Sequence, residues 1–365
     1  MSTGSASIPL LKAAPEADQV AERLVGGPWA GLELCLMPGH VRDDAAADRA
    51  AETVRRAVDA SGGEVALTAE APVAWPSGAF VRVDRLDDEA RAGIVRSARF
   101  AAAIGSPVLT IHLFIPQTTA ELRAAGGVDE PAVERFLRCF ADTCGEHGVV
   151  PLIENVPPVL RMRTGGVYLT PIGGHWRDLL SWRARVPALG FTFDTSHAAL
   201  FHTFAGAYPS LWGLEGEEGL ELGRYVEELG PAGEVAHVSN AAGVLGEGLP
   251  YHEGELDLDP IVARIGELFP YVVAEINEPD HARSPSMKAG YRSVARALPS
   301  PAGPWRRPPR RVPGERFDWQ LVTRRRDPVP AVLELEEALG GRRVLVTGGA
   351  GSIGRALTTL FEAFR

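Results

Sequence analysis

The sequence predicts an α/β fold: a (β/α)8 barrel followed by a Pro/Arg-rich linker and an incomplete Rossmann βα unit. Two observations carry the barrel prediction. Eight short apolar runs, rich in β-branched residues, alternate with longer segments of helical periodicity over residues 1–298, as in parallel strands joined by helices. The composition, 45% hydrophobic and 23% charged in 365 residues, is that of a globular chain with a sizeable core. An open doubly wound sheet is the alternative, because periodicity alone does not close a barrel.

The expected strands and helices follow one another in regular order. We expect strands at residues 7–11, 31–36, 64–70, 107–113, 149–155, 190–195, 234–239 and 271–276. Helical periodicity is clearest at residues 43–60, 87–104, 131–147 and 260–268. The strand segments are short and largely apolar, whereas a strand buried on both faces is expected to be a continuous run of Val, Ile and Leu. The helical segments repeat their apolar residues every three or four positions.

Charge and composition divide the chain near residue 299. Residues 299–365 hold 12 arginines and 7 acids, a balance of +5, whereas residues 1–298 hold 25 basic and 40 acidic residues, a balance of −15. We therefore expect the barrel at 1–298, the linker at 299–330 and the Rossmann fragment at 331–365. So acidic a body is a poor match for a phosphate backbone, which excludes nucleic acid as the expected partner.

Membrane insertion and secretion are also disfavoured. No run approaches the roughly 18 apolar residues of a membrane span, and the N-terminal residues lack the layout of a signal peptide. The three cysteines, Cys35, Cys139 and Cys144, match no disulfide framework and no zinc spacing. A cytoplasmic protein is therefore expected.

Ionisable side chains lie late in consecutive expected strands. Glu154, Asp194, His237 and Glu275 follow one another in the fifth to eighth strands, and His112 lies in the fourth. A buried ionisable group needs a partner or a metal ion. Because the carboxyl ends of barrel strands meet at one mouth, these residues predict a metal site there. A purely structural polar network is the alternative.

These motifs resemble the xylose isomerase-like barrel superfamily, which includes ketose 3-epimerases, inosose-type isomerases and dehydratases, and endonuclease-IV-type repair enzymes. The resemblance covers residues 7–297 and implies that Glu154, Asp194, His237 and Glu275 bind one divalent cation. It also implies that His197 contacts a substrate hydroxyl. The motifs that carry it are GLELCL, LIENV, FTFDTSH, AHVSN, HEGELDLDPI and AEINEP.

Two positions depart from the patterns of that superfamily. The multi-zinc nucleases have a His-Ala-Pro element where this chain has Glu70, which argues against a three-zinc cluster. His252 stands where a glycine is usual ahead of the Glu-Gly-Glu stretch. We include Glu70, His112 and His252 with His197 as candidate substrate-binding residues. For His112 a hydrogen-bonded residue lining the barrel is an equal alternative, and for His252 a variable loop residue is the alternative.

The expected function is a divalent-metal-dependent isomerase or epimerase of a sugar, ketose or cyclitol. Three carboxylates and one imidazole favour Mn²⁺, with Mg²⁺, Co²⁺, Fe²⁺ or Zn²⁺ as alternatives. The ion would stabilise an enediolate formed by proton removal next to a carbonyl. The resemblance implies that Glu154 and Glu275 remove the proton on one face and return it on the other.

Other functions and assemblies stay open at this point. A cyclitol dehydratase would use the same metal site. An endonuclease-IV-like hydrolase and a non-catalytic barrel module fused to a nucleotide-sugar reductase are further alternatives. A small carbohydrate is the expected partner, and a homodimer is open.

The C-terminal segment RRVLVTGGAGSIGRAL carries a separate motif. A short apolar run leads into Gly348, Gly351 and Gly354, a spacing suited to a phosphate-binding turn before a helix. It resembles the opening of extended short-chain dehydrogenase/reductases of the nucleotide-sugar epimerase and dehydratase branch. The acidic residue expected about 20 positions later is missing, so we expect a truncated or vestigial unit. NAD(P) binding is expected only in a longer fusion.

Overall fold

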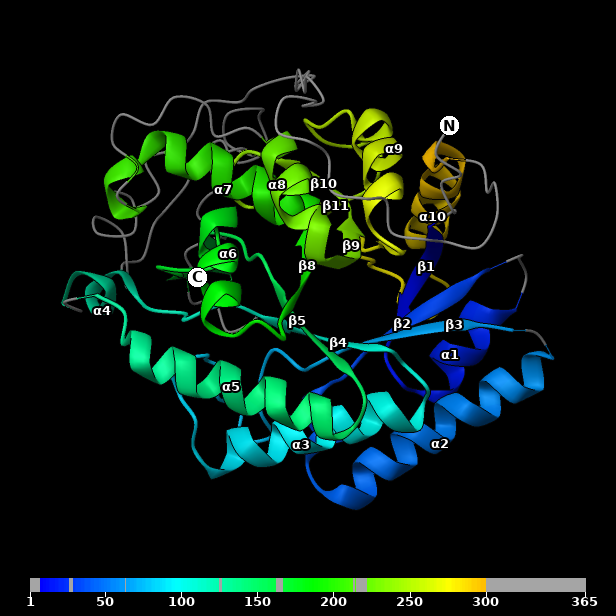
Figure 1. Cartoon of the computed structure of the whole chain (residues 1–365). Helices are drawn as coiled ribbons and strands as arrows, with labels where there is room; N and C mark the ends of the chain where they lie inside the picture. The colour runs from blue at the N-terminus through cyan, green and yellow to red at the C-terminus, as the bar shows by residue number, and fades with distance from the viewer. Residues whose placement is uncertain are drawn as a thin grey trace, which may run out of the picture.

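The computed structural model describes residues 7–25, 29–62, 64–124, 127–161, 167–212, 214 and 222–299. Within them, eight parallel strands form a closed barrel in the order β1-β12-β9-β8-β5-β4-β3-β2 (Figure 1). Closure excludes the open doubly wound sheet, and all eight expected strands are confirmed. They are β1 (Ile8–Ala13), β2 (Gly31–Cys35), β3 (Ala66–Glu70), β4 (Val108–His112), β5 (Val150–Glu154), β8 (Gly190–Asp194), β9 (Gly233–Val238) and β12 (Tyr271–Ala274).

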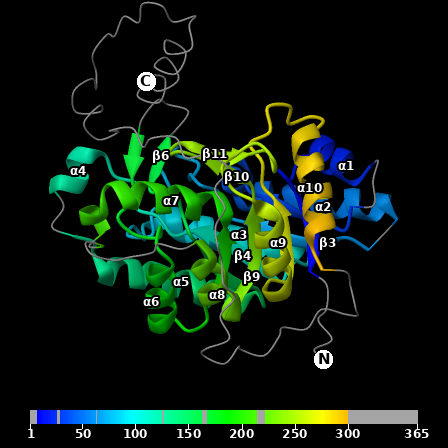
Figure 2. The same cartoon turned by 90° about the horizontal axis from the view of Figure 1, so that it is seen from above.

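Helices surround this barrel, as the two views show (Figures 1 and 2). The four segments with the clearest helical periodicity are confirmed as α2, α3, α5 and α9. The Asp43 and Asp87 carboxylates cap α2 and α3 by accepting from the backbone N–H groups of Ala46 and Ala90. The α-helices are α1 (Ala17–Leu24), α2 (Asp44–Ser61), α3 (Asp88–Ala103), α4 (Thr119–Ala124), α5 (Glu130–Glu146), α6 (Trp176–Arg185), α7 (Thr195–Ala207), α8 (Leu222–Leu229), α9 (Leu258–Leu268) and α10 (Pro285–Ala297).

Short elements complete the loops. Two antiparallel hairpins follow barrel strands: β6 (Val159–Arg161) with β7 (Val167–Leu169) after β5, and β10 (Asn240–Ala242) with β11 (Gly246–Leu249) after β9. Both therefore stand at the carboxyl end of the barrel, where the predicted site lies. Three short 3₁₀ helices, η1 (Pro38–Val41), η2 (Pro209–Trp212) and η3 (Gly230–Ala232), complete the set in the described residues.

The barrel interior is built in layers by the two-residue period of its strands. Its apolar layer consists of Leu10, Val108, Leu152, Val235 and Val273. Two residues further along each strand the side chains again point inward, and there four of the five strands carry an ionisable residue. Hydrophobic helix faces pack on the outside of the barrel in one large core. The ionisable residues at the mouth of the barrel therefore lie directly above an apolar layer.

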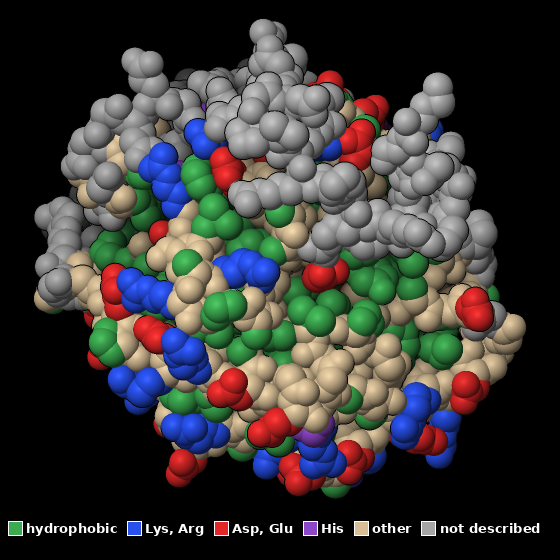
Figure 3. Space-filling model, in the orientation of Figure 1, with side chains coloured by type: hydrophobic (Ala, Val, Ile, Leu, Met, Phe, Trp, Pro, Cys, Tyr) green, Lys and Arg blue, Asp and Glu red, His purple; other side chains and the backbone are tan. Residues whose placement is uncertain are grey.

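Charged side chains are mixed on the outer helices. In the face shown in Figure 3, basic and acidic side chains lie interspersed among apolar ones. Arg96 pairs with Asp44 at 2.9 Å and Arg99 with Asp48 at 2.8 Å, joining α3 to α2. Among the described residues, no helix is both long and apolar enough to cross a bilayer. Residues 300–365, which include nearly all of the expected linker and the Rossmann unit with Gly348, Gly351 and Gly354, lie outside the described part of the chain.

Candidate metal centre

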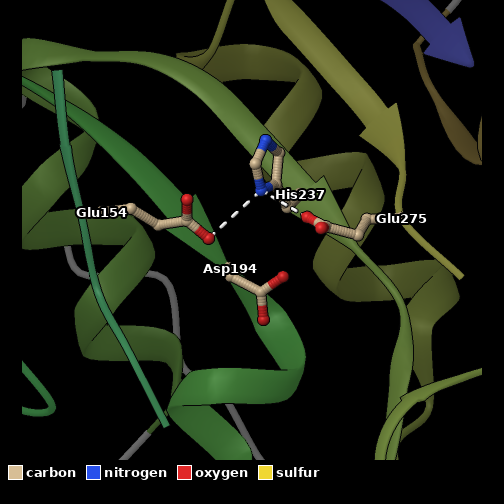
Figure 4. Close-up of side chains that lie close together, drawn as sticks. All are labelled: Glu154, Asp194, His237 and Glu275. Atoms are coloured by element: carbon tan, nitrogen blue, oxygen red, sulfur yellow. Dashed lines mark hydrogen bonds and ion pairs between the residues drawn. The ribbon is translucent and has the colours of Figure 1, made fainter. Parts of the chain in front are cut away.

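The structure brings together the four side chains expected to bind a cation. One ligand atom from each of Glu154, Asp194, His237 and Glu275 lies within 4.8 Å of the others, and the side chains converge on a common point (Figure 4). Glu154, Asp194 and His237 are buried, while the Glu275 side chain is 27% exposed. The group therefore opens toward the mouth through Glu275.

Strand period and register explain why these residues meet. Glu154, His237 and Glu275 each stand two residues beyond Leu152, Val235 and Val273 of the apolar layer, so they point into the barrel above it. Asp194 of β8 is paired in register with His237 of β9. Closure of the barrel then brings the four ends around one axis.

The side chain of Asn155, the residue after β5, is hydrogen-bonded to the backbone of Asp194 at the end of β8. Its side-chain amide donates to the backbone oxygen of Asp194 at 3.0 Å, and its amide oxygen accepts from the Asp194 N–H at 2.8 Å. The Asp194 carboxylate caps α7, accepting from the His197 N–H at 2.6 Å and from Ser196 Oγ at 2.9 Å. Asp194 is thus held in one orientation by β5 on one side and α7 on the other.

His237 lies between three carboxylates. Its Nε2 is 2.8 Å from Glu33 Oε2. Its Nδ1 is 3.2 Å from Glu154 Oε1 and 2.5 Å from Glu275 Oε2. One ring nitrogen carries at most one proton, so two carboxylate oxygens compete for Nδ1. The contact with Glu33 on the opposite nitrogen orients the ring as carboxylates do for metal-binding histidines.

The residues present fit a divalent cation. Glu154 Oε2 is buried without a hydrogen-bond partner in the structure, and an unsatisfied buried carboxylate oxygen is costly. Glu275 Oε2 is buried as well and shares Nδ1 of His237 with Glu154. Three carboxylates and one imidazole are the ligand types that Mn²⁺ and related ions accept. A cation among them would be bound by Nδ1 of His237 and by both carboxylate oxygens, so that they would no longer compete for one proton.

Burial and neighbouring charges shift the pKa values of the three carboxyl groups in different directions. Burial alone raises the pKa of Glu154, but His237 and His112 outweigh it and lower the pKa to about 2. Burial also acts upward on Glu275, whose pKa His237 and Lys12 hold well below its usual range. Burial raises the pKa of Asp194 to about 6. At neutral pH all three are anionic, as metal ligands must be.

Two of the expected substrate-binding histidines border this centre. His197 Nδ1 donates to the backbone oxygen of Asn155 at 2.8 Å, and its Nε2 is 3.2 Å from Glu247 Oε1 of β11. His112 lies 3.7 Å from Glu70 Oε1 through Nδ1 and 3.7 Å from Glu154 Oε2 through Nε2. His112 therefore links Glu70 to the ligand group.

The fourth expected residue lies elsewhere. His252 contacts Ser293 of α10 at 3.2 Å and packs edge-on against Tyr251. It belongs to none of the clusters of ligand atoms in the described residues. Its position agrees with a loop residue that is held by α10, and a substrate-binding role for it stays a prediction.

Sequence reasoning missed Lys12 and Glu33. Lys12 forms ion pairs with Glu70 and Glu275 and lies 3.8 Å from Glu33 Oε2. The first strand was expected to end at residue 11, where the apolar run stops, but β1 continues to Ala13. The sequence pattern includes Glu33 only as part of the GLELCL motif and predicts no role for its carboxylate. The missed signal is a charged residue within a strand whose neighbours are apolar.

Comparisons with known proteins agree with this architecture. Residues 27–297 match the xylose isomerase-like TIM barrel family, and a comparison with curated proteins found no match. A D-tagatose 3-epimerase-like protein is 15% identical (TM-score 0.53; 79% of this chain and 98% of that one covered). The apo form of 3-keto-D-glucoside 4-epimerase YcjR from E. coli is 14% identical (0.52; 80% and 98%). An AP endonuclease of family 2 from Brucella melitensis is 18% identical (0.50; 76% and 96%). At these identities the likeness shows the shared fold alone.

Proposed function

This chain belongs to the xylose isomerase-like TIM barrel family, and on that premise we propose that it is a divalent-metal-dependent isomerase or epimerase of a sugar, ketose or cyclitol. The observation that carries the proposal is the convergence of Glu154, Asp194, His237 and Glu275 within 4.8 Å at the mouth. Two proteins of similar fold are named a D-tagatose 3-epimerase-like protein and a 3-keto-D-glucoside 4-epimerase, and these names support the substrate class.

Glu154, Asp194, His237 and Glu275 would hold the ion, for which Mn²⁺ is our first choice. When bound, such an ion supplies Lewis-acid stabilisation of the negative charge that develops on a carbonyl oxygen. The protein contributes the fixed geometry: Asn155 and the start of α7 hold Asp194, and Glu33 orients His237. A site that is organised before substrate arrives spends little energy on rearrangement.

Glu154 and Glu275 are the proposed proton-transfer groups. They stand on β5 and just beyond β12, and both approach His237 Nδ1. Both are anionic at neutral pH because His237 lowers their pKa values. A carboxylate on each side of a substrate carbon can remove a proton from one face and return it to the other.

His197 and Glu247 would bind substrate hydroxyl groups. The Nε2 atom of His197 faces Glu247 Oε1 at 3.2 Å, and the Glu247 side chain is 39% exposed. Because His197 Nδ1 is engaged by the Asn155 carbonyl, only the Nε2 side can serve a ligand. A hydroxyl inserted between these two groups could donate to one and accept from the other.

Solvent exchange tests the proposal. The full chain, loaded with Mn²⁺, is incubated in D₂O with a set of ketoses and inososes, and deuterium in the substrate carbon is measured by NMR. We expect incorporation with at least one of them, and its loss in Glu154→Gln and Glu275→Gln, because each change removes a base. Glu52→Gln, on α2, is the matched control, because the Glu52 side chain is 43% exposed and pairs with Arg55 of the same helix. It should exchange like the wild type.

The outcome also separates related reactions. Deuterium uptake with a change of configuration supports an epimerase, whereas loss of water from a cyclitol indicates the dehydratase that would use the same groups. Full turnover after removal of the metal, or unchanged exchange in both glutamine variants, would overturn the proposed mechanism.

A further inference from the structure

A second group of ligand atoms adjoins the proposed centre on the side of β2 and β3. One atom from each of Glu33, Glu70 and His237 lies within 4.8 Å of the others. Glu33 and Glu70 are almost completely buried, and the contacts of their Oε2 atoms are with cationic or ionisable groups: Glu33 Oε2 lies 2.8 Å from His237 Nε2, and Glu70 Oε2 forms an ion pair with Lys12. Buried anionic oxygens of this kind need a cation close by.

The cation that the chain itself supplies is the ammonium group of Lys12. It pairs with Glu70 and lies 3.8 Å from Glu33 Oε2, and its side chain is only 12% exposed. It reaches this position from β1, the strand hydrogen-bonded to β2. A compact positive charge therefore sits among carboxylates that could otherwise hold a metal ion.

Glu275 joins this ammonium group to the proposed metal centre. Its Oε1 pairs with Lys12, and its Oε2 lies 2.5 Å from His237 Nδ1. The two oxygens of one carboxylate thus face two cation positions. Carboxylates that bridge in this way are common where two metal ions lie about 3.5–4 Å apart.

We propose that Glu33, Glu70 and Glu275 form a second divalent-cation site that Lys12 keeps closed, so that the protein carries one metal ion. The inference rests on the metal centre proposed above, and it adds a reason why the mouth holds one metal ion and not two. Five carboxylates, Glu33, Glu70, Glu154, Asp194 and Glu275, meet in the mouth. Three of them, Glu33, Glu70 and Glu275, surround the Lys12 ammonium. Without the ammonium, these three carboxylates lose the cation that they share, and a divalent cation would take its place.

Metal content of the full chain tests this inference. Wild type, Lys12→Met and Lys12→Gln are dialysed against Mn²⁺, and bound manganese is measured by mass spectrometry together with the electron paramagnetic resonance spectrum. We expect one ion in the wild type and two in each Lys12 variant, with the spectrum of two coupled ions. Lys288→Met is the matched control, because Lys288 is the one other lysine of the chain and pairs with Glu22 of α1, which is not among the clustered ligand residues. It should bind one ion.

A double variant identifies the ligands of the second ion. Lys12→Met combined with Glu70→Gln should return to one ion, since it loses a carboxylate of the second site but none of the first. Circular dichroism establishes whether each variant folds. If Lys12→Met does not fold, the metal content of Lys12→Gln decides the test.

The readout does not depend on turnover. One ion in the wild type and one in every folded Lys12 variant would overturn this inference and leave the proposed function standing. Two ions in the wild type would overturn it as well. No bound ion in any form would overturn the proposed function, and the inference with it.

Discussion

Glu33 offers the sharpest test of how the metal centre is organised, because it contacts His237 but is not one of the four residues that would hold the first ion. Its side chain is fully buried, with Oε2 2.8 Å from His237 Nε2 and Oε1 accepting from Thr68 Oγ1 at 3.2 Å. The negative charge of Glu33 makes the imidazole more electron-rich and holds its ring with Nδ1 toward the centre. We therefore expect Mn²⁺ affinity to fall when Glu33 is replaced.

The expected loss of Mn²⁺ affinity has two sources, the negative charge of Glu33 and its direct contact with His237. Outer partners of metal-binding histidines are worth 10- to 100-fold in affinity, about 1.4 to 2.7 kcal/mol. Glu33→Gln keeps an oxygen that can face Nε2 and loses only the charge, so about a 10-fold loss is expected. Glu33→Ala loses both, so the loss should approach about 100-fold.

Competition with a chelating fluorophore measures the Mn²⁺ dissociation constant of each variant. Glu52→Gln on the surface of α2 controls for a change of net charge and should match the wild type. If both Glu33 variants fold and bind Mn²⁺ as the wild type does, Glu33 does not position His237, and the geometric argument is wrong.

Three further outcomes concern stability. Burial raises the pKa of Asp178, which accepts from the Gly173 N–H, to about 6, above about 3.9 in an unfolded chain. The folded state then binds the extra proton between these values, so this group's contribution to stability falls as pH rises from about 4 to about 6. The free energy of unfolding of Asp178→Asn, measured by urea titration, should rise by about 1–3 kcal/mol relative to the wild type between about pH 4 and about pH 6. If the two free energies change in parallel with pH, this prediction is wrong. Gly93→Ala places a methyl group 2.3 Å from the Trp75 ring and should lower the free energy of unfolding by about 1–3 kcal/mol. Gly145→Ala, with nothing within 4 Å of the new methyl group, should raise it by up to about 1 kcal/mol. Equal thermal midpoints in the two variants would refute the packing argument. Removing the metal should lower the thermal midpoint of the wild type, since an ion at 100 times its dissociation constant adds about 2.7 kcal/mol, and should affect Glu154→Gln less.

Much of the fold and part of the site could be read from local patterns. The eight strands and four helices were predictable because strand and helix periods are written in neighbouring residues. Glu154, Asp194, His237 and Glu275 stood out for the same reason, since each interrupts an apolar run near its end. That each binds a metal ion stays a prediction, as do the linker and the Rossmann unit beyond residue 299.

The sequence by itself determined the order of strands and helices and the ionisable residue at or next to the carboxyl end of each of four strands, because these are properties of short segments. Only the tertiary structure decided that the sheet closes, with β1 paired to β12. That closure brings Lys12 to Glu275, 263 positions away, and sets Glu33 against His237. Such contacts depend on the register between distant strands, which no local pattern encodes.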